Sequence, residues 1–97
     1  YTLGVWKVKP GQEQAFIATW KRLGAFFYSL PGPPGPGTLI QSLEDPTQFY
    51  SFGPWRSLED IQAMRADPRT PDQIGKLMAL CDEAKPDAFR VVAQVSE

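Results

Sequence analysis

The hydrophobic period of this chain changes repeatedly between two residues and about four, and the order of these changes restricts the fold more than any single motif does. Apolar residues that alternate with other residues are typical of strands, whereas apolar residues three and four apart are typical of helices. Along the chain these patterns predict a strand, a helix, two strands, a helix split in two, and a last strand. This order predicts an α+β fold of the ferredoxin-like βαββαβ type, with a four-stranded antiparallel sheet and helices on one face.

The first strand and the first helix are predicted in the opening part of the chain. Residues 3–8 form a short β-type run, which Pro10 and Gly11 close because proline lacks a backbone donor and glycine permits a turn. Residues 12–28 then change to helical spacing. The segment 31–37, with the sequence PGPPGPG, can neither continue a helix nor join a central strand, so it predicts a stiff loop. The apolar face of the helix carries Phe16, Trp20, Leu23 and Phe27.

The remaining strands are predicted from three further alternating segments. Residues 38–44 and 48–55 both alternate, and Asp45 with Pro46 marks a turn between them, so these two strands should form a hairpin. Residues 89–95 alternate again and predict the fourth strand.

Two helix starts are expected between the hairpin and the last strand. Ser57 with Asp60 resembles a weak capping box at the start of a short second helix. Thr70 followed by Pro71 predicts an N-cap and a proline at the first helical position, which is the strongest local signal in the chain. The spacing of apolar residues then predicts a helix that reaches Cys81.

Both faces of the predicted sheet are apolar, which indicates a homodimer. An antiparallel sheet covered by helices on one side normally has one polar, solvated face. Burial of the second face against another copy is the simplest way to avoid a large exposed apolar surface. In the first strand Leu3 and Val5 share one side and Trp6 and Val8 the other, and in the third strand Phe49 and Trp55 lie opposite Tyr50 and Phe52.

Composition excludes several classes of function. The 97 residues suit one domain, and we expect a single domain spanning residues 1–97. The net charge of −1 with scattered Lys and Arg argues against nucleic acid, and no apolar run approaches the roughly 18 residues that cross a membrane. No basic and apolar leader opens the sequence, so a cytoplasmic protein is expected. Cys81 is the only cysteine and there is no histidine, so neither an internal disulfide nor a metal site is expected.

Several short motifs occur at characteristic places between Gly4 and Val95. They are Lys9, Pro10, Gly11 and Glu13 after the first strand, Phe16 and Trp20 on the first helix, Phe52, Trp55 and Ser57 before the second helix, and the Asp67–Pro68 step. With these features the segment resembles the antibiotic biosynthesis monooxygenase superfamily, the dimeric α+β barrel group. The resemblance implies a homodimer whose sheets face each other, with a pocket between each sheet and its own helices. It also implies that Trp55 lines this pocket.

The chain also departs from that family's pattern. Members that oxidise aromatic polyketides or haem usually pair the tryptophan with an asparagine, and often with a histidine. This sequence contains neither residue type, and Ser51 and Met64 stand near the places where such polar groups are often found. Haem degradation would therefore lack its usual imidazole ligand.

The resemblance implies a cofactor-independent monooxygenase that acts on a small aromatic or quinol-type compound. Such a reaction needs an electron-rich substrate anion, which the protein binds, orients and stabilises. Trp55, Tyr50 and Arg90 are the candidate catalytic residues, and no metal or organic cofactor is expected. The candidate substrate-binding residues are Trp6, Trp20, Phe52, Ser51 and Met64.

Other interpretations remain open at this stage. Each aromatic residue could simply pack in the core, and Arg90 could form an interface ion pair or lie at a solvated edge. A non-catalytic small-molecule-binding or regulatory protein of the same fold is the main alternative, and an isomerase or decarboxylase that uses Tyr50 or Arg90 is a third. Hydrolase and nicotinamide chemistry are set aside, since no histidine can activate a nucleophile and no glycine-rich phosphate loop is present.

Overall fold

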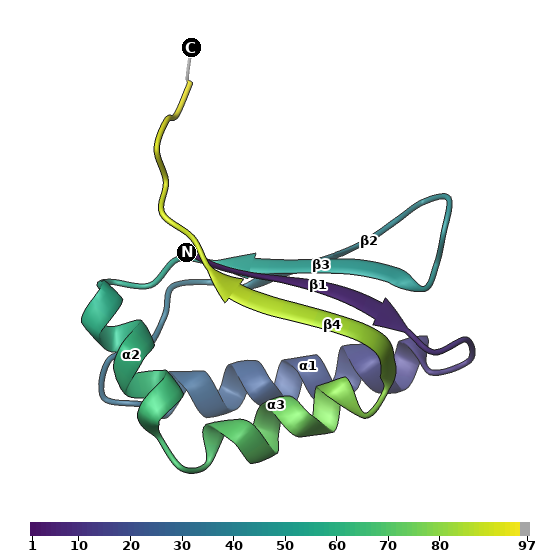
Figure 1. Cartoon of the computed structure of the whole chain (residues 1–97), viewed down its shortest axis with the longest axis horizontal. Coiled ribbons are helices and arrows are strands. Elements are labelled where there is room, and N and C mark those ends of the chain that lie inside the picture. Colours follow the sequence, from purple (N-terminus) through teal and green to yellow (C-terminus); the bar gives the residue numbers. More distant parts are fainter. Residues whose placement is uncertain (96–97) are drawn as a thin grey trace.

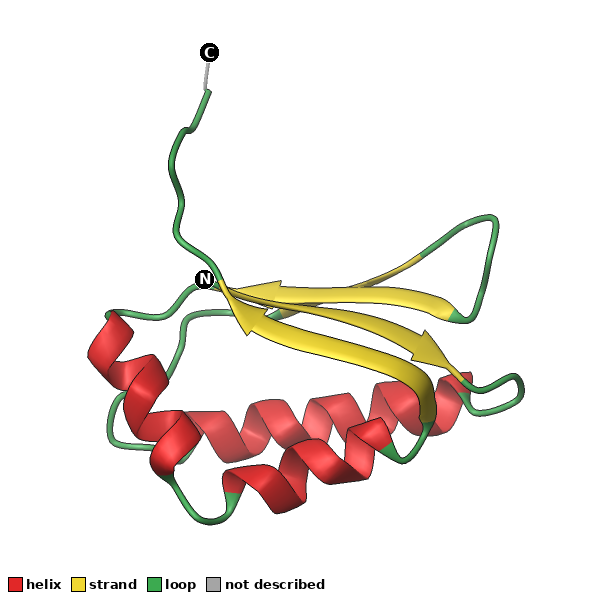
Figure 2. Cartoon of the chain, viewed as in Figure 1, coloured by secondary structure: helices red, strands yellow, loops and turns green. Residues whose placement is uncertain are grey.

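The chain forms two layers, with helices covering one face of a four-stranded antiparallel sheet (Figure 2). A computed structural model describes residues 1–95. The strand order β2-β3-β1-β4 places the first strand in the centre, and it confirms the predicted ferredoxin-like α+β fold. The elements are β1 (Thr2–Val8), α1 (Glu13–Tyr28), β2 (Thr38–Gln41), β3 (Gln48–Gly53), α2 (Leu58–Ala66), α3 (Thr70–Met78) and β4 (Cys81–Ala88), as Figure 1 shows.

The two faces of the sheet follow the alternation read from the sequence. Along β1, Trp6 and Val8 are buried beneath the helices, whereas Leu3 and Val5 on the other face are only partly buried. β3 repeats this pattern, with Phe49 buried and its neighbours more exposed. We call the side beneath the helices the inner face and the opposite side the outer face. The outer face of the isolated chain carries exposed aromatic and aliphatic side chains, among them Ile40, Tyr50 and Phe52.

The core between the layers is centred on Phe16 of α1. Its ring lies 5.6 Å from that of Trp6 and 5.0 Å from that of Phe49, at tilted angles that suit the charge distribution of aromatic rings. Leu77 of α3 is fully buried in the same cluster. Full burial of one such side chain contributes about 1.5–3 kcal/mol, so this cluster is the main source of hydrophobic stabilisation.

The position of the last strand differs from the sequence prediction. β4 spans Cys81–Ala88, and the alternating segment 89–95 lies outside any strand. β4 pairs only with β1, and such an edge strand tolerates charged residues and a proline such as Pro86, because only one of its sides must form hydrogen bonds. β4 is therefore recognised from its pairing with β1 and not from any alternation of its own side chains.

The C-terminal segment 89–95 leaves the sheet at the end of β4 and extends away from both layers (Figure 1). Two backbone hydrogen bonds between Phe89 and Tyr1, of 2.9 and 2.7 Å, fix the point where it departs. Every residue from Phe89 to Val95 is exposed.

Helix α3 also differs from the sequence prediction at both of its ends. It ends at Met78 and so does not reach Cys81, which begins β4. Thr70 is the first helical residue and not the cap, because its buried hydroxyl donates to the Met64 carbonyl oxygen at 2.6 Å instead of capping. The N-cap position is occupied by Arg69, whose side chain forms no capping bond.

The start of α2 and the hairpin agree more closely with the prediction. The Ser57 hydroxyl accepts from the Asp60 backbone amide at 3.2 Å, although the Asp60 carboxylate pairs with Arg56 and does not complete a capping box. β2 and β3 are antiparallel neighbours, as expected, but end earlier than predicted, at Gln41 and Gly53.

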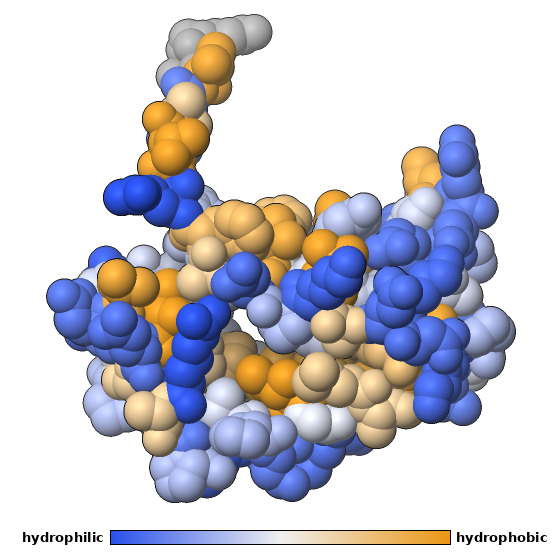
Figure 3. Space-filling view, in the orientation of Figure 1, coloured by the Kyte–Doolittle hydropathy of each residue, from blue (hydrophilic) through white to orange (hydrophobic). Residues whose placement is uncertain are grey.

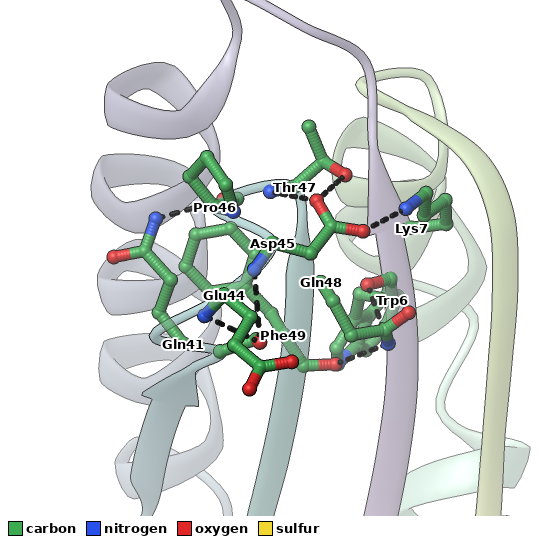
Figure 4. A network of polar contacts seen from close by, with 10 residues as sticks. Trp6, Lys7, Gln41, Glu44, Asp45, Pro46, Thr47, Gln48 and Phe49 are labelled. Carbon is green, nitrogen blue, oxygen red and sulfur yellow. Dashed lines mark hydrogen bonds and ion pairs between the residues drawn. The ribbon is translucent and has the colours of Figure 1, made fainter.

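The turn between β2 and β3 is held by the carboxylate of Asp45 (Figure 4). One oxygen accepts from the backbone amide of Thr47 at 3.0 Å and from its hydroxyl at 2.6 Å, and the other pairs with Lys7 of β1. The Lys7 contact holds the pKa of Asp45 at about 2, below the ordinary 3.8, with the Thr47 bonds adding to the effect. The turn is thus tied to the central strand.

Candidate functional site

The sheet leaves a space beneath α1 at the end where β1 begins. On the inner face there, Thr2 pairs with Gly53 and Gly4 pairs with Ser51. Neither glycine contributes a side chain, and other groups lie over both: the Trp6 indole covers Gly4, and the backbone of Pro36 and Gly37 lies against Gly53. Gly4 must stay a glycine, since an added Cβ would lie 2.5 Å from the Trp6 Nε1 atom.

Two adjoining cavities occupy this space. The first has a volume of about 440 Å³ and the second about 370 Å³. Both volumes lie in the range of roughly 300–1,000 Å³ that is typical of small-molecule sites. We call them the first and second chambers, and they share Thr2, Leu23 and Phe27 as a common boundary. Figure 3 shows a hollow between the sheet and the helices, with hydrophobic residues below it and hydrophilic residues along its left and upper rim.

Aromatic side chains form the walls of the first chamber. Trp20 enters it from α1, and Trp55 enters it from the connection that follows β3. The Trp55 ring meets Phe27 edge to face, with 5.4 Å between centroids. Two indoles from different elements thus border the chamber, and Trp55 does so from the strand-to-helix junction.

The stiff loop 31–37 closes another side of the first chamber. The Tyr28 hydroxyl donates to the Gly35 carbonyl oxygen at 3.1 Å, and the Gly35 amide donates to the Pro54 carbonyl oxygen at 2.8 Å. The loop is therefore fixed both to the end of α1 and to the connection after β3. Gly37 of this loop faces Trp20, since an added Cβ there would be in ordinary van der Waals contact with the indole, at 3.4 Å.

The second chamber lies nearer to α2, α3 and β4. Trp6 and Gly4 border it from β1, and Met64 and Ile74 border it from the helices. Arg65 and Asp87 also border it and form an ion pair at 3.7 Å between α2 and β4. Both of these side chains are more than half exposed, so the pair contributes little to stability.

Two indole nitrogens donate hydrogen bonds to hydroxyl groups on the inner face. Trp6 Nε1 donates to the Ser51 hydroxyl at 2.9 Å, and Trp55 Nε1 donates to the Thr2 hydroxyl at 3.1 Å. The first bond is buried in the core, while the second lies at the boundary of the two chambers. These bonds set the direction in which each indole points.

The structure brings together most of the predicted binding residues. Trp20 and Trp55 border the first chamber, whereas Trp6 and Met64 border the second. Ser51 borders neither chamber but holds the Trp6 ring. Phe52 borders the first chamber, although the alternation of β3 directs its side chain to the outer face.

Two predicted catalytic residues lie elsewhere. Tyr50 is 40% exposed on the outer face, across the sheet from the chambers. Arg90 is exposed on the C-terminal segment. Neither residue borders a chamber of the isolated chain.

Three of the residues that border the chambers illustrate what sequence reasoning misses. Thr2 lies just before the predicted first strand, although the period of two through Gly4 and Trp6 includes it. Phe27 is predicted only as part of the apolar face of the first helix. Lys21 stands beside the first chamber and shows no signal in the sequence, because an exposed helical lysine is common.

Reactive groups of other kinds are scarce among residues 1–95. No cluster of three or more His, Cys, Asp or Glu side chains in this range could hold a metal ion. Burial raises the pKa of the Cys81 thiol to about 11, so it is protonated at neutral pH and is a poor nucleophile. Within the same residues no helix is both long and apolar enough to span a bilayer.

Known structures share this architecture. A variant of SnoaB, a cofactor-independent oxygenase from Streptomyces nogalater, is 20% identical, with 99% of this chain and 95% of that chain covered and a TM-score of 0.86. SnoaB itself is 21% identical, with 94% of this chain and 92% of that chain covered and a TM-score of 0.76. A conserved protein from Methanosarcina mazei Go1 is 22% identical, with 92% of this chain and 88% of that chain covered and a TM-score of 0.74. Likeness at this level of identity establishes the fold.

The sequence carries the evidence for the family. No curated protein matches the chain. The family model described as antibiotic biosynthesis monooxygenase matches residues 1–70, which include both indoles of the first chamber. The chain therefore belongs to the antibiotic biosynthesis monooxygenase family.

Proposed function

We propose that this protein is a cofactor-independent monooxygenase that oxidises a small aromatic or quinol-type compound held between the sheet and the helices. The observation that carries this proposal is the pair of adjoining chambers with Trp20, Trp55 and Trp6 in their walls. Flat indole rings suit flat aromatic ligands, because offset and edge-to-face ring contacts are favourable. Family membership and the fold shared with a cofactor-independent oxygenase support the reaction type.

In this reaction the substrate supplies all the electrons. A phenol that loses its proton becomes an electron-rich anion, and it transfers electrons to O2 until a ring C–H carbon has become a carbonyl carbon. One oxygen atom enters the product as that carbonyl, and the other leaves as water with the two hydrogens that the phenol loses. The protein has to bind the anion, orient it and exclude water.

The residues that we assign to binding follow from the walls of the chambers. Trp20 and Trp55 would sandwich the ring system in the first chamber, and Trp6 and Met64 would contact the part that extends into the second. Trp55, the candidate catalytic residue in the first chamber, would act through its ring and through Thr2, since its one N–H is already donated to the Thr2 hydroxyl. Ser51 would act indirectly, by holding Trp6.

The test is oxygen consumption by the purified protein with a panel of quinols and anthrones. We expect consumption of one O2 for each substrate molecule, and a loss of at least tenfold in rate for Trp55→Ala. Leu43→Ala is the matched control, because Leu43 is fully exposed in the β2–β3 turn and borders neither chamber. If no compound is consumed while ligands still quench tryptophan fluorescence, the enzyme proposal fails.

That outcome would favour a second candidate, a non-catalytic binding or regulatory protein. The observation behind it is that the charged groups of the chambers, Lys21, Arg65 and Asp87, belong to largely exposed residues. A chamber with few internal acid or base groups can bind an aromatic ligand without reacting with it.

We also propose that the protein is a homodimer formed through the outer face of the sheet. That face exposes Tyr50, Phe52 and Ile40, and the exposed apolar segment 89–95 leaves the sheet at one of its edges. This segment has the alternation of a strand but no partner strand among residues 1–95, and a second copy would offer it one. Sedimentation that shows a stable monomer at micromolar concentration would contradict this assembly.

A further inference from the structure

Thr2 lies at the one place where a polar side chain on the inner face meets both chambers. It borders the first and second chambers, together with the apolar residues Leu23 and Phe27. Its neighbour across the ladder is Gly53, against which the backbone of Pro36 and Gly37 lies. Because Thr2 borders both chambers, a ligand that spans them would pass beside this residue.

The hydrogen bond from Trp55 determines what this hydroxyl can offer. An indole N–H can only donate, so the Thr2 oxygen must be the acceptor in the 3.1 Å contact with Trp55 Nε1. The hydroxyl keeps its own proton, and no hydrogen bond found among residues 1–95 uses it. The proton is thus directed away from the indole, and Thr2 can present a donor to a ligand.

Ser51 provides an internal comparison. It accepts the same kind of bond from Trp6, at 2.9 Å, but it is only 9% exposed and borders neither chamber. In the core, the bond between Trp6 and Ser51 holds a packed ring. At the boundary, the bond between Trp55 and Thr2 leaves a hydroxyl that a ligand can reach. The two pairs have the same chemistry and differ only in their position.

We propose that Thr2 is a positioning residue of the ligand site: its hydroxyl donates a hydrogen bond to a carbonyl or phenolate oxygen of an aromatic ligand, and Trp55 sets its direction. This inference rests on the proposed function of the chambers. The inference predicts that the ligand carries a polar oxygen where the two chambers meet, and aromatic surface in each chamber. Because the rest of the boundary is apolar, an oxygen placed elsewhere along it would lose its hydrogen bond.

The experiment uses two probes that differ in one carbonyl oxygen, 1-tetralone and tetralin. Binding to the wild-type protein, Thr2→Val, Thr2→Ser and Thr38→Val would be measured by calorimetry. Valine keeps the shape of threonine and suits a strand, and circular dichroism would verify the fold. Thr38→Val is the matched control, because Thr38 is an exposed threonine on β2 that borders neither chamber.

We expect Thr2→Val to weaken 1-tetralone binding roughly three- to tenfold, the value of one neutral hydrogen bond. Tetralin affinity should change less than about twofold, and Thr2→Ser should restore 1-tetralone binding, because it restores the donor. Trp55→Phe should also weaken 1-tetralone binding, and Thr2→Val should then add less than it does in the wild-type protein, since the two groups act as a unit.

The outcomes that would overturn the inference are distinct. If Thr2→Val weakens both probes equally, Thr2 acts by shape alone and the donor role is wrong. If 1-tetralone binds but Thr2→Val leaves its affinity unchanged, the inference fails while the proposed ligand site stands. If neither probe binds the wild-type protein, both the inference and the proposed function of the chambers fail.

Discussion

The two ends of the interface between sheet and helices contain aromatic residues alike, yet only one end is hollow. At the closed end Val8, Phe16 and Phe49 are fully buried and pack against Leu77. At the open end Gly4 and Gly53 are among the residues that border the two chambers, although the Trp6 indole covers Gly4 and the loop 31–37 lies against Gly53. Aromatic content alone therefore does not distinguish a core from a ligand site. The difference is that side chains from the sheet and from the helices fill the closed end, whereas they leave the chambers unfilled at the open end.

The largest expected effect comes from truncation of a ring at each end. Phe49→Ala should destabilise the protein by about 3–5 kcal/mol, because it empties a filled core. Phe27→Ala at the open end should cost less than about 2 kcal/mol, because its ring is partly exposed and already borders free space. Urea denaturation measures both values, and equal losses would mean that the open end is packed as tightly as the core.

The next prediction distinguishes the effect of a filled chamber on ligand binding from the effect of a more stable helix. Gly24 of α1 borders the first chamber, and an added Cβ there meets no atom within 4 Å. Gly24→Leu should therefore stabilise the helix by roughly 0.5–1 kcal/mol and at the same time weaken ligand binding, since the new side chain occupies part of the chamber. Thermal unfolding and fluorescence quenching measure the two effects.

Gly75→Leu is the control for that variant. Gly75 also lies inside a helix with no atom within 4 Å of an added Cβ, but it borders neither chamber. It should increase stability by a similar amount and leave binding unchanged. A loss of binding in both variants would show that helix stability, and not occupied volume, controls the site.

A smaller effect is expected at the loop 31–37. Tyr28→Phe removes the hydrogen bond to the Gly35 carbonyl oxygen, which should cost about 0.5 kcal/mol because the bond is exposed. Hydrogen exchange at the Gly35 amide should become faster, since this amide donates to Pro54 on the far side of the loop. Unchanged exchange would indicate that the prolines alone hold the wall of the chamber.

The smallest effect concerns the Asp45 turn, which lies outside the layer interface. The pKa of Asp45 is lowered to about 2, so its contribution is fully present above the ordinary value of 3.8 and is lost as the pH falls toward 2. Asp45→Asn should therefore reduce stability slightly at neutral pH and reduce the loss on acidification. Carboxyl NMR titration of Asp45 with a midpoint near 3.8 would contradict this assignment.

Elements whose side chains face a buried layer were predictable from the sequence. The alternation of Trp6 and Val8 against Leu3 and Val5 separated the two faces of β1 correctly, because side chains alternate along a strand, although both sets are apolar and only the structure shows which one the helices cover. The helical spacing of Phe16 and its neighbours located α1 in the same way. Trp55 was located at the mouth of a strand-to-helix junction on local grounds, and it does border a chamber.

Edge and boundary features were not predictable in this way. β4 has little buried surface, so its sequence lacks the pattern that would reveal it, while the alternating segment 89–95 forms no strand in the described chain. Thr70 has the residue type of a cap, but its hydroxyl is taken by the Met64 carbonyl oxygen from the preceding helix. In each case a neighbouring element decides the outcome.

The sequence by itself determined the order of the elements and the alternation within the strands that face the core, because hydrophobic period is a local property that any layered fold must satisfy. Only the tertiary structure decided where the interior stays empty and which hydroxyl faces that space. The register of β1 with β3 sets Thr2 beside Gly53, and the chain path after β3 brings Trp55 back to Thr2 across 53 positions of sequence. A cavity is a relation between two surfaces, so neither surface alone can specify it.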